Sequence, residues 1–461
     1  MINRKFVNRE RELKILKEKA KSDNFELIIL YGRRRIGKTT LLKKFLENKE
    51  HIYFLCSKRK LEYNLKKFSW KISDYLKIPR TEFNSFKEAF EAILSKNKKI
   101  IIAIDEFGYL VEKDEGILSD FQEIIDELLK STKIKLILCG SIVSVMETQV
   151  LGYKSPLYGR CTLQIKLKPF VFEDIFKWFE KINFEDGIKI YGVTNNIPKY
   201  LEFFEGKNIE EEIKNNFFKC ESFLYQDTIN ILSEELRDYT TYFQILEAIA
   251  LGYTKITEIA NYSFIHAKDV YSYIKVLEKM DIVKRETPLL SSRKSKRGIY
   301  KIKDNYFNFW FRFVSPYQDE IESFSLKEAV HNFEKNFNTY LGLVFEELIT
   351  DLIRRNLVSI IPFTKIGKWW HKDKEIDIVA LNEQTKEILF AECKWQTKVN
   401  AKKLCKELEE KAQYVQWHND QRKENFAIFT KSFSKRINEF QGRKVYCFDL
   451  KDLEKATVLR N

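Results

Sequence analysis

The chain has 461 residues, of which 44% are hydrophobic and 32% charged, with only 15 glycines and 7 prolines, so wholesale disorder and collagen-like or low-complexity architectures are excluded. Lys and Arg (81) exceed Asp and Glu (67) by 14, an excess typical of proteins that bind polyphosphates. The seven cysteines lack paired spacing, which argues against a disulfide framework or a zinc site. No apolar run approaches the roughly 18 residues that span a bilayer, so we expect a cytoplasmic protein with no membrane partner.

Four regions of the chain differ in their pattern. Residues 1–167 alternate short β-type apolar runs with helical stretches, which predicts a parallel α/β sheet of the nucleotide-binding type. Residues 168–236 lack strand signals and predict a helical lid. Residues 237–315 run helix, short helix, helix and two short strands around a polar turn, which is the order of a winged helix. Residues 316–461 predict a second, smaller α/β domain.

The expected regular elements follow the chain in this order. The strands of the first region are Leu27–Tyr31, Ile52–Cys56, Ile100–Ile104, Leu136–Cys139 and Thr162–Leu167. The lid and the winged helix contain the helices Asp174–Lys181, Ile209–Phe217, Tyr242–Leu251, Ile256–Asn261 and Asp269–Met280, then the strands Ile282–Thr287 and Ile299–Lys303. The last region contains the helices Asn338–Asn356 and Lys402–Trp417 and the strands Ile360–Lys365, Glu375–Leu381, Ile388–Lys394, Phe426–Thr430 and Val445–Phe448.

A phosphate-binding loop follows the first strand. The segment from Gly32 to Thr39 matches GxxxxGK[ST] in full and leads into a helical stretch. In such a loop the backbone N–H groups turn toward the phosphates, the lysine reaches the β and γ oxygens, and the hydroxyl ligates Mg²⁺. The sequence therefore predicts a site for ATP and Mg²⁺, formed by Gly32, Arg33, Arg34, Arg35, Ile36, Gly37, Lys38, Thr39 and Thr40.

Catalytic candidates follow the later strands of the same region. The strand Ile100–Ile104 ends in Asp105, which we expect to hold Mg²⁺, and Glu106, which we expect to polarise the attacking water. A glutamate in this place favours hydrolysis over binding alone. Ser141 follows the next strand as a candidate γ-phosphate sensor, although Gly-Ser also commonly marks a turn. Arg160 either neutralises transition-state charge, in cis or in trans, or is a solvated or salt-bridged arginine.

These motifs together resemble the archaeal-type ATPases of the STAND and AAA-like P-loop group. The resemblance covers about 200 residues and depends on FVNRE at Phe6–Glu10, the P-loop, IDEF, CGS, SPLYGR and NIPKYL at Asn196–Leu201. It implies a conformational switch driven by ATP, in which the opening segment packs near the adenine and Pro198 helps to sense the nucleotide. The chain departs from the family at Asn8, where a glycine is usual, and at Asn195-Asn196, where Gly-Gly is usual.

The predicted hairpin of the third region is strongly basic. Residues 284–303 contain eight basic side chains and one acid, a net charge of +7. Such a hairpin predicts salt-dependent binding to the phosphate backbone of DNA, with weak sequence preference. The predicted helix Asp269–Met280, which precedes the hairpin, would enter a groove of the DNA. The candidate contacts are Lys268, Tyr271, Ser272, Lys275, Arg293, Lys294, Lys296 and Arg297. The alternative is a winged helix that acts as a protein-docking module or a hinge.

Two acids and a lysine form a second candidate site in the last region. Glu392 and Lys394 lie two residues apart on one predicted strand and therefore share a face. If the strand with Asp377 pairs alongside, two carboxylates can bind Mg²⁺ or Mn²⁺, and Lys394 can orient water and stabilise the phosphorane charge. Glu346 in the preceding helix would add a third acid, and Gln413 is a weaker candidate. This chemistry is typical of phosphodiester hydrolysis.

Over residues 338–450 this arrangement resembles the PD-(D/E)xK nucleases, and in particular the DUF234 domain that often follows the archaeal-type ATPase. The resemblance implies a restriction-endonuclease-like fold with Asp377, Glu392 and Lys394 at the motif positions. Two functions follow from the sequence. One is ATP-regulated binding and cutting of DNA, in genome defence or repair. The other is a signalling or scaffolding ATPase that binds partners or nucleic acid without cutting, as an oligomer or with a protein partner.

Overall fold

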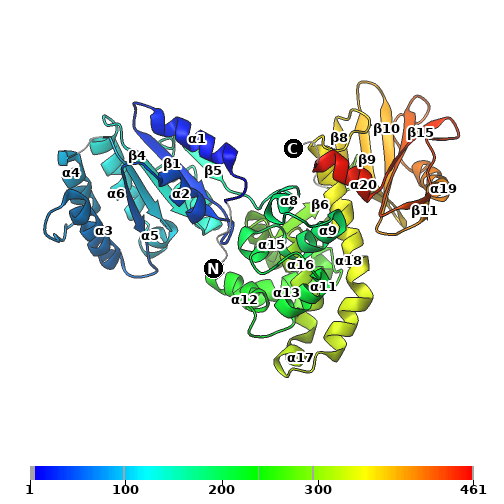
Figure 1. Cartoon of the computed structure of the whole chain (residues 1–461), viewed down its shortest axis with the longest axis horizontal. Helices are drawn as coiled ribbons and strands as arrows, with labels where there is room; N and C mark the ends of the chain where they lie inside the picture. Colours follow the sequence, from blue (N-terminus) through cyan, green and yellow to red (C-terminus); the bar gives the residue numbers. More distant parts are fainter. Residues whose placement is uncertain (1–5, 97–98, 237, 293–294, 459–461) are drawn as a thin grey trace. The chain divides into compact units, whose positions relative to one another are not determined.

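The computed structural model describes residues 6–96, 99–236, 238–292 and 295–458, and it separates the chain into two compact units (Figure 1). The first unit runs to Phe170 and includes residues 197–199. The second contains residues 171–196 and the chain from Tyr200 onward. Among the helices described in either unit, none combines the length and the apolar character needed to cross a membrane.

The described part of the first unit is built on a five-stranded parallel sheet in the order β2-β3-β4-β1-β5. The predicted alternation of strands and helices is therefore confirmed. The strands are β1 (Glu26–Tyr31), β2 (His51–Leu55), β3 (Ile101–Asp105), β4 (Lys135–Gly140) and β5 (Leu163–Lys166). The helices are α1 (Glu10–Lys21), α2 (Lys38–Leu46), α3 (Leu61–Leu76), α4 (Phe86–Lys96), α5 (Gly108–Lys113), α6 (Ile117–Glu123) and α7 (Val143–Val145).

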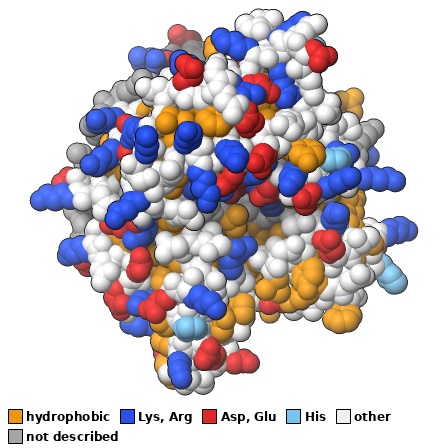
Figure 2. Space-filling view, turned by 90° about the vertical axis from the view of Figure 1, so that its right-hand side faces the viewer, with side chains coloured by type: hydrophobic (Ala, Val, Ile, Leu, Met, Phe, Trp, Pro, Cys, Tyr) orange, Lys and Arg blue, Asp and Glu red, His pale blue; other side chains and the backbone are white. Residues whose placement is uncertain are grey.

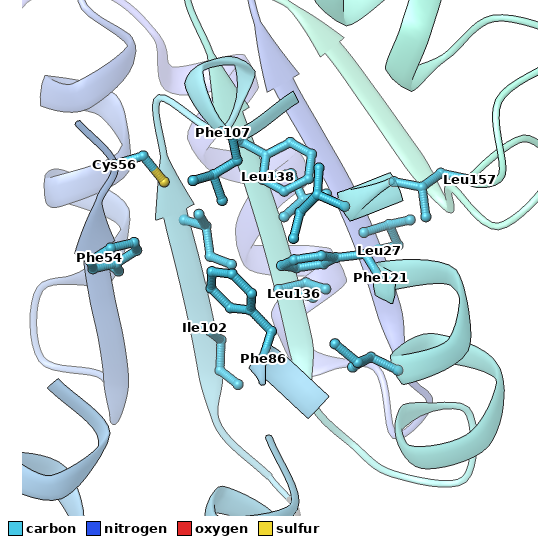
Figure 3. Packing of buried hydrophobic residues seen from close by; sticks show 14 of the residues in the cluster. Leu27, Phe54, Cys56, Phe86, Ile102, Phe107, Phe121, Leu136, Leu138 and Leu157 are labelled. Carbon is cyan, nitrogen blue, oxygen red and sulfur yellow. The ribbon is translucent and has the colours of Figure 1, made fainter. Parts of the chain in front are cut away.

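Apolar side chains fill both faces of this sheet. Strands β1, β3 and β4 are buried along their whole length, as expected for parallel strands with helices on both sides. Successive residues point to opposite faces, so Leu27 and Leu136 enter one core cluster and Ile28 and Ile137 the other. Figure 3 shows the first cluster, in which the side chain of Phe121 meets the edge of Phe107 at 5.1 Å between ring centroids. The sheet is thus fixed at its centre, next to the ends of β1, β3 and β4.

The second unit begins with a helical region. Its helices before the hairpin are α8 (Asp174–Trp178), α9 (Phe184–Thr194), α11 (Ile209–Phe217), α12 (Phe223–Glu235), α13 (Tyr239–Ala250), α14 (Ile256–Ser263) and α15 (Ala267–Lys279). An antiparallel hairpin of β6 (Val283–Glu286) and β7 (Ile299–Ile302) follows, and Val283 pairs with Ile302. The expected order of three helices and two strands is present, with boundaries that differ by at most three residues.

Two helices hold this region together, of which the sequence patterns predicted the second but not the first. Helix α16 (Asn305–Phe313) has the sequence NYFNFWFRF and buries all six of its aromatic residues. It packs against the first half of α18 (Lys327–Arg354), where Tyr340 donates a hydrogen bond to the carbonyl of Gly192. The long helix begins at Lys327 rather than at the expected Asn338, because Phe333 and Phe337 continue its apolar face onto α16.

The C-terminal part of the second unit is a mixed sheet, six-stranded over its described residues, in the order β14-β15-β12-β10-β9-β8. The strands are β8 (Lys365–His371), β9 (Lys374–Asn382), β10 (Glu387–Lys394), β12 (Lys423–Thr430), β14 (Glu439–Phe440) and β15 (Arg443–Phe448), and β11 (Val399–Asn400) pairs separately with β13 (Phe433–Lys435). Helices α19 (Ala401–Ala412) and α20 (Leu450–Thr457) complete this part.

One strand expected in this part is misplaced by the sequence pattern. Residues 360–364 contain Pro362, which has no N–H to donate, and they form no strand in the structure. The first strand of the sheet is instead β8, which pairs with β9 in antiparallel register over the sequence KIGKWWH. The shift matters for the candidate site because β8 carries Lys368 next to the strand that carries Asp377.

Candidate functional site

The P-loop between β1 and α2 has the backbone that its glycines permit. Gly32 has a φ of +150°, and a Cβ on it would lie 2.4 Å from the carbonyl oxygen of Leu167. Gly37 has a φ of +88° and precedes the first residue of α2. Arg35 between them also lies in the left-handed region, with a φ of 69°. The loop therefore turns tightly enough to aim its N–H groups inward, at the N-terminus of a helix where a phosphate is favoured.

The structure brings together the predicted Mg²⁺ ligands. Thr39 Oγ1 donates to Asp105 Oδ2 at 2.8 Å, and Asp105 is fully buried. A hydroxyl and a carboxylate are the oxygen donors that Mg²⁺ takes beside nucleotide phosphates, so this pair fits the ion. Lys38 Nζ donates to the carbonyl oxygens of Gly32 and Arg33 at 2.9 and 2.8 Å, which keeps its ammonium at the mouth of the loop.

Tyr53 on β2 is an additional site residue that the sequence patterns did not identify. Its hydroxyl donates to the same Asp105 oxygen as Thr39, at 2.8 Å. Burial and the nearby Asp105 carboxylate raise the pKa of Tyr53 well above its usual range, so the phenol stays a neutral donor. Only the order of strands in the sheet reveals this contact, because β2, which carries Tyr53, lies beside β3, which carries Asp105. The P-loop strand β1 lies on the other side of β3, with β4 between them.

Glu106 is held by Ser141 at the ends of β3 and β4. Glu106 Oε2 accepts hydrogen bonds from Ser141 Oγ at 2.6 Å and from Ser141 N at 3.2 Å. Glu106 has a φ of 56°, a left-handed conformation that is costly for a residue with a Cβ and that aims this carboxylate past the end of the strand. The serine therefore positions the expected catalytic carboxylate, a closer relation than the sequence could indicate.

Arg160 is paired with an acid in this structure. Its guanidinium contacts Asp126 through both Nε and NH2, and its NH1 donates to the carbonyl of Pro156 at 2.9 Å. The hydrogen bonds from Arg160 lower the pKa of Asp126 to about 2. The salt-bridged arrangement expected as an alternative is thus the one observed, and Arg160 has to leave Asp126 before it can act on a nucleotide.

The remaining P-loop candidates differ in their exposure to solvent. Arg33 and Ile36 are buried, whereas Thr40 is exposed on α2. Arg34 NH2 donates to the hydroxyl of Tyr109 at 2.9 Å, and its guanidinium lies near the ring of the same tyrosine. Tyr109 therefore positions Arg34 of the GRRRIGKT segment beside the loop.

Two family motifs far apart in the sequence are attached to the P-loop. Arg9 of the opening segment donates through NH2 to the carbonyls of Ile36, at 3.2 Å, and Lys168, at 2.7 Å. Lys199, which follows Pro198 in α10 (Pro198–Leu201), donates its N–H to the carbonyl of Arg35 at 3.3 Å. Both motifs can therefore respond to the conformation of the loop.

The departures from the family pattern preserve the backbone conformation. Asn8 has a φ of 58°, and Asn195 and Asn196 each have a φ of 51°. Asparagine is the residue that most readily replaces glycine in this left-handed region. The substitutions for glycine thus keep the turns that the motifs require.

The second candidate site lies on the C-terminal sheet, where β9 and β10 run antiparallel. Asp377 on β9 accepts a hydrogen bond from the N–H of Cys393 on β10 at 2.9 Å. Glu392 is 1% exposed and lies 2.8 Å from Lys394 Nζ. The expected pairing of the two strands and the shared face of Glu392 and Lys394 are therefore present in the structure.

Two further lysines, not identified from the sequence, complete this cluster. Lys411 on α19 makes a short ion pair with Glu392, whereas Gln413, two residues later, is exposed. Lys368 Nζ on β8 lies 3.1 Å from Glu346, 3.4 Å from Glu375 and 3.8 Å from Asp377. A helical or strand pattern does not reveal such cross-element pairs, because they depend on which elements become neighbours.

The carboxylates are the right type of ligand for a divalent ion but are balanced by lysines. Oxygen donors from Glu346, Asp377 and Glu392 are those that Mg²⁺ and Mn²⁺ prefer. Within the part of the chain that the structure describes, no group of three Asp, Glu, His or Cys side chains is arranged as a ready metal site. The cluster, as it stands, is a network of ion pairs.

The pKa values of the two central acids of this cluster are shifted in opposite directions. Burial, together with the carboxylates of Glu392 and Glu346, raises the pKa of Asp377 to about 7. Burial acts in the same sense on Glu392, but the charges of Lys394 and Lys411 outweigh it and lower the pKa of Glu392. Near neutral pH, Asp377 therefore exchanges a proton while Glu392 stays ionised.

The raised pKa of Asp377 makes the free energy of unfolding depend on pH. Folded Asp377 keeps its proton up to about pH 7, whereas the unfolded chain releases it near pH 4. The resulting stabilisation is complete below about pH 4 and is lost as the pH rises through about 7. Asp377→Asn cannot ionise. We therefore expect its free energy of unfolding, relative to that of the wild type, to rise by about 2–3 kcal/mol from pH 5 to pH 8. Chemical unfolding at the two pH values measures the gain, and Glu383→Gln, at an exposed acid, should show none.

The expected nucleic-acid contacts lie on α15 and the hairpin. Lys268 and Lys275 are exposed on α15, where Lys275 pairs with Glu278 at 2.6 Å. Lys296 and Arg297 are exposed before β7, whereas Arg293 and Lys294 lie outside the described residues. Figure 2 shows Lys and Arg side chains interspersed with acidic ones over the face that it presents, so on this face the basic excess is not gathered in one patch.

Comparisons with known proteins agree with the sequence motifs. A family model described as an ATPase domain predominantly from Archaea matches residues 6–204, and a second, DUF234, described as Archaea bacterial proteins of unknown function, matches residues 310–405. An uncharacterized protein of Methanocaldococcus jannaschii is 40% identical over 459 residues, which cover 97% of this chain and 99% of that protein. A second uncharacterized protein of that organism is 26% identical over 327 residues, 63% of each chain.

A solved structure supports the same assignment for the fold. A Walker-type ATPase of Pyrococcus abyssi is similar with a TM-score of 0.52 and 23% identity, and the match covers 67% of this chain and 96% of that chain. At this identity the likeness shows a shared fold. Since one relative matches nearly the whole chain and both family models match it in order, the chain belongs to the archaeal P-loop ATPases that carry a DUF234 domain after the ATPase domain.

Proposed function

We propose that this ATPase couples a nucleotide switch to DNA binding and to metal-dependent phosphodiester cleavage. In this proposal Lys38 and the P-loop bind ATP with Mg²⁺, and Glu106 polarises the water that attacks the γ-phosphate. Helices α13 to α15 and the β6–β7 hairpin act as a winged helix, and the C-terminal sheet as a nuclease-like domain. In this proposal the chain has four functional regions, with boundaries at residues 167, 236 and 315.

One observation supports a link between DNA binding and the C-terminal acids. The basic hairpin and these acids line the same cavity of the second unit. This cavity has a volume of about 860 Å³ and is lined by residues 284–292 of the hairpin, by Glu346 and Arg354 of α18, and by Lys368 and Asp377. The hairpin also contacts the helix that carries Glu346, because Lys284 pairs with Glu347 of α18 at 2.5 Å. A phosphodiester strand that follows the basic hairpin would therefore reach the carboxylates.

The cluster has the groups that phosphodiester hydrolysis requires. Asp377 and Glu392 would hold Mg²⁺ or Mn²⁺, with Glu346 as a third acid, and the ion would supply an activated water. Lys394 would stabilise the negative charge that develops on the phosphorus-bound oxygens. The buried, acid-rich pairing of β9 and β10 supports this assignment.

A gel-based cleavage assay tests the proposed function. Linear and circular DNA are incubated with the full chain in Mg²⁺ or Mn²⁺, with ATP, with a non-hydrolysable analogue and without nucleotide. We expect metal-dependent cleavage whose rate changes with the nucleotide. A chain that hydrolyses ATP but leaves every DNA intact under all these conditions would contradict the nuclease part of the proposal and leave the ATPase part standing.

A second candidate function is a signalling or scaffolding ATPase that binds partners or nucleic acid without cutting. The observation in its favour is the pairing of Glu392 with both Lys394 and Lys411, which leaves the buried carboxylate balanced by protein charge. In that case the C-terminal part would still bind, and the cleavage assay would be negative. Retained DNA binding without cleavage would favour this candidate.

The basic hairpin gives a prediction on salt dependence. We expect Lys296→Ala with Arg297→Ala to weaken DNA binding and to reduce the slope of log affinity against log salt by about one unit for each lost phosphate contact. Adding Arg293→Ala and Lys294→Ala should extend the effect. Fluorescence anisotropy with labelled duplex DNA at several salt concentrations measures the slope. The matched control is Lys17→Ala with Lys21→Ala, at exposed positions of α1, and an unchanged slope in the hairpin variant would assign the hairpin to another partner.

A further inference from the structure

The acid–lysine cluster contains nearly as many positive as negative charges. Its carboxylates are Glu346, Glu375, Asp377 and Glu392, and its ammonium groups are Lys368, Lys394 and Lys411. Lys394 and Lys411 both form ion pairs with Glu392, whereas Lys368 forms ion pairs with the other three acids. The two halves of the cluster are thus balanced by different lysines.

Lys368 occupies the place where the other three acids converge. Its Nζ lies within 3.8 Å of oxygens from Glu346, Glu375 and Asp377, which come from one helix and one strand. The side chain is 13% exposed, so the protein rather than solvent provides most of its surroundings. A cation surrounded by three carboxylates takes the same oxygen donors that a divalent metal ion needs.

We propose that Lys368 is the resident cation of this cluster and competes with a divalent metal ion for Glu346 and Asp377. This inference rests on the proposed metal-dependent site and adds the residue that controls its occupancy. An ammonium and a divalent ion cannot share these oxygens, because like charges so close repel strongly in a buried environment. Metal binding therefore requires Lys368 Nζ to leave its partners.

The contacts of Lys368 hold its backbone in place and leave its side chain beside a cavity. The N–H of Leu289, in the loop of the hairpin, donates to the carbonyl oxygen of Lys368 at 2.8 Å, which fixes the backbone of β8 at this residue. The side chain has a flexible four-carbon stem, and it lines the cavity of about 860 Å³ beside the cluster. The ammonium can thus swing into the cavity while the strand stays in place.

Calorimetric titration of the full chain with Mn²⁺, without nucleotide, tests this competition. Lys368→Met keeps the length of the side chain and removes its charge, so we expect Mn²⁺ to bind at least about tenfold more tightly than to the wild type. Lys368→Arg should show no such gain. Lys365→Met is the matched control on the same strand, since Lys365 pairs with Glu383 on the surface. The gain should vanish when Asp377→Ala is added to Lys368→Met.

A second measurement uses the wild-type chain and needs no variant to fold. Lysine acetylation followed by peptide mass spectrometry should label Lys368 slowly without metal and several-fold faster in saturating Mn²⁺, while the rate at Lys365 stays constant. Equal Mn²⁺ affinity of the wild type and Lys368→Met, or unchanged labelling of Lys368, would overturn the inference. Tighter Mn²⁺ binding by Lys368→Met in a chain that never cuts DNA would retain it and contradict only the nuclease proposal.

Discussion

Glu106→Gln is expected to bind ATP as tightly as the wild type and to hydrolyse it about 10²–10⁴-fold more slowly. The glutamine amide oxygen can still accept the hydrogen bonds from Ser141, so the loop geometry is kept while the carboxylate that polarises water is lost. Lys38→Ala should instead abolish nucleotide binding, because Lys38 acts on phosphate rather than on water. The two variants should therefore differ in kind.

Titration with a fluorescent ATP analogue and a phosphate-release assay separate these two effects. Glu112→Gln is the matched control, since Glu112 is an exposed glutamate in the neighbouring helix α5. Its turnover should equal that of the wild type. Wild-type turnover in Glu106→Gln would show that another group activates the water, and ATP binding by Lys38→Ala would reassign the lysine.

Asp377→Ala and Glu392→Ala are expected to lose DNA cleavage altogether while ATP hydrolysis continues in the other unit. Each change removes a negative oxygen donor from a cluster that lysines already balance, so the ion would be held too weakly to activate water. Glu392→Gln is the gentler variant, because it keeps the shape of a side chain that lies between two lysines. Lys394→Ala should still bind metal and cut poorly.

The gel-based assay with Mg²⁺ or Mn²⁺ measures cleavage, and calorimetric titration of the same samples measures metal binding. Glu383→Ala, an exposed acid that pairs with Lys365, should cut like the wild type. Cleavage that survives all three substitutions at Asp377, Glu392 and Lys394 would remove these residues from the site. Metal binding that survives both acid substitutions would place the ion elsewhere.

The sequence predicted the parts of the molecule whose signal is local. The P-loop needs a fixed spacing of glycines, Lys38 and Thr39, and the acids after β3 mark the end of a buried strand, so both were identified from short segments. The shared face of Glu392 and Lys394 also followed from the two-residue period of a strand, whereas the sequence left open whether the strand that carries Asp377 pairs beside it, as it does in the structure.

The parts that sequence patterns missed depend on which elements become neighbours. Lys368 lies in a strand that was expected several residues earlier, and Lys411 lies on a helix whose orientation no periodicity reveals. The ion pair of Arg160 with Asp126 likewise joins segments 34 residues apart. Such partners are selected by packing, because a buried charge needs an opposite charge within a few ångströms regardless of its sequence distance.

The long helix α18 joins the two parts of the second unit mechanically. Its 28 residues span about 42 Å. Its first half is locked among the aromatic rings of α16, and its second half carries Glu346 beneath β8 and β9. A straight helix held at its aromatic end would carry any tilt of that end to Glu346 in its second half. The position of this carboxylate in the acid–lysine cluster therefore depends on how the first half of α18 packs against α16.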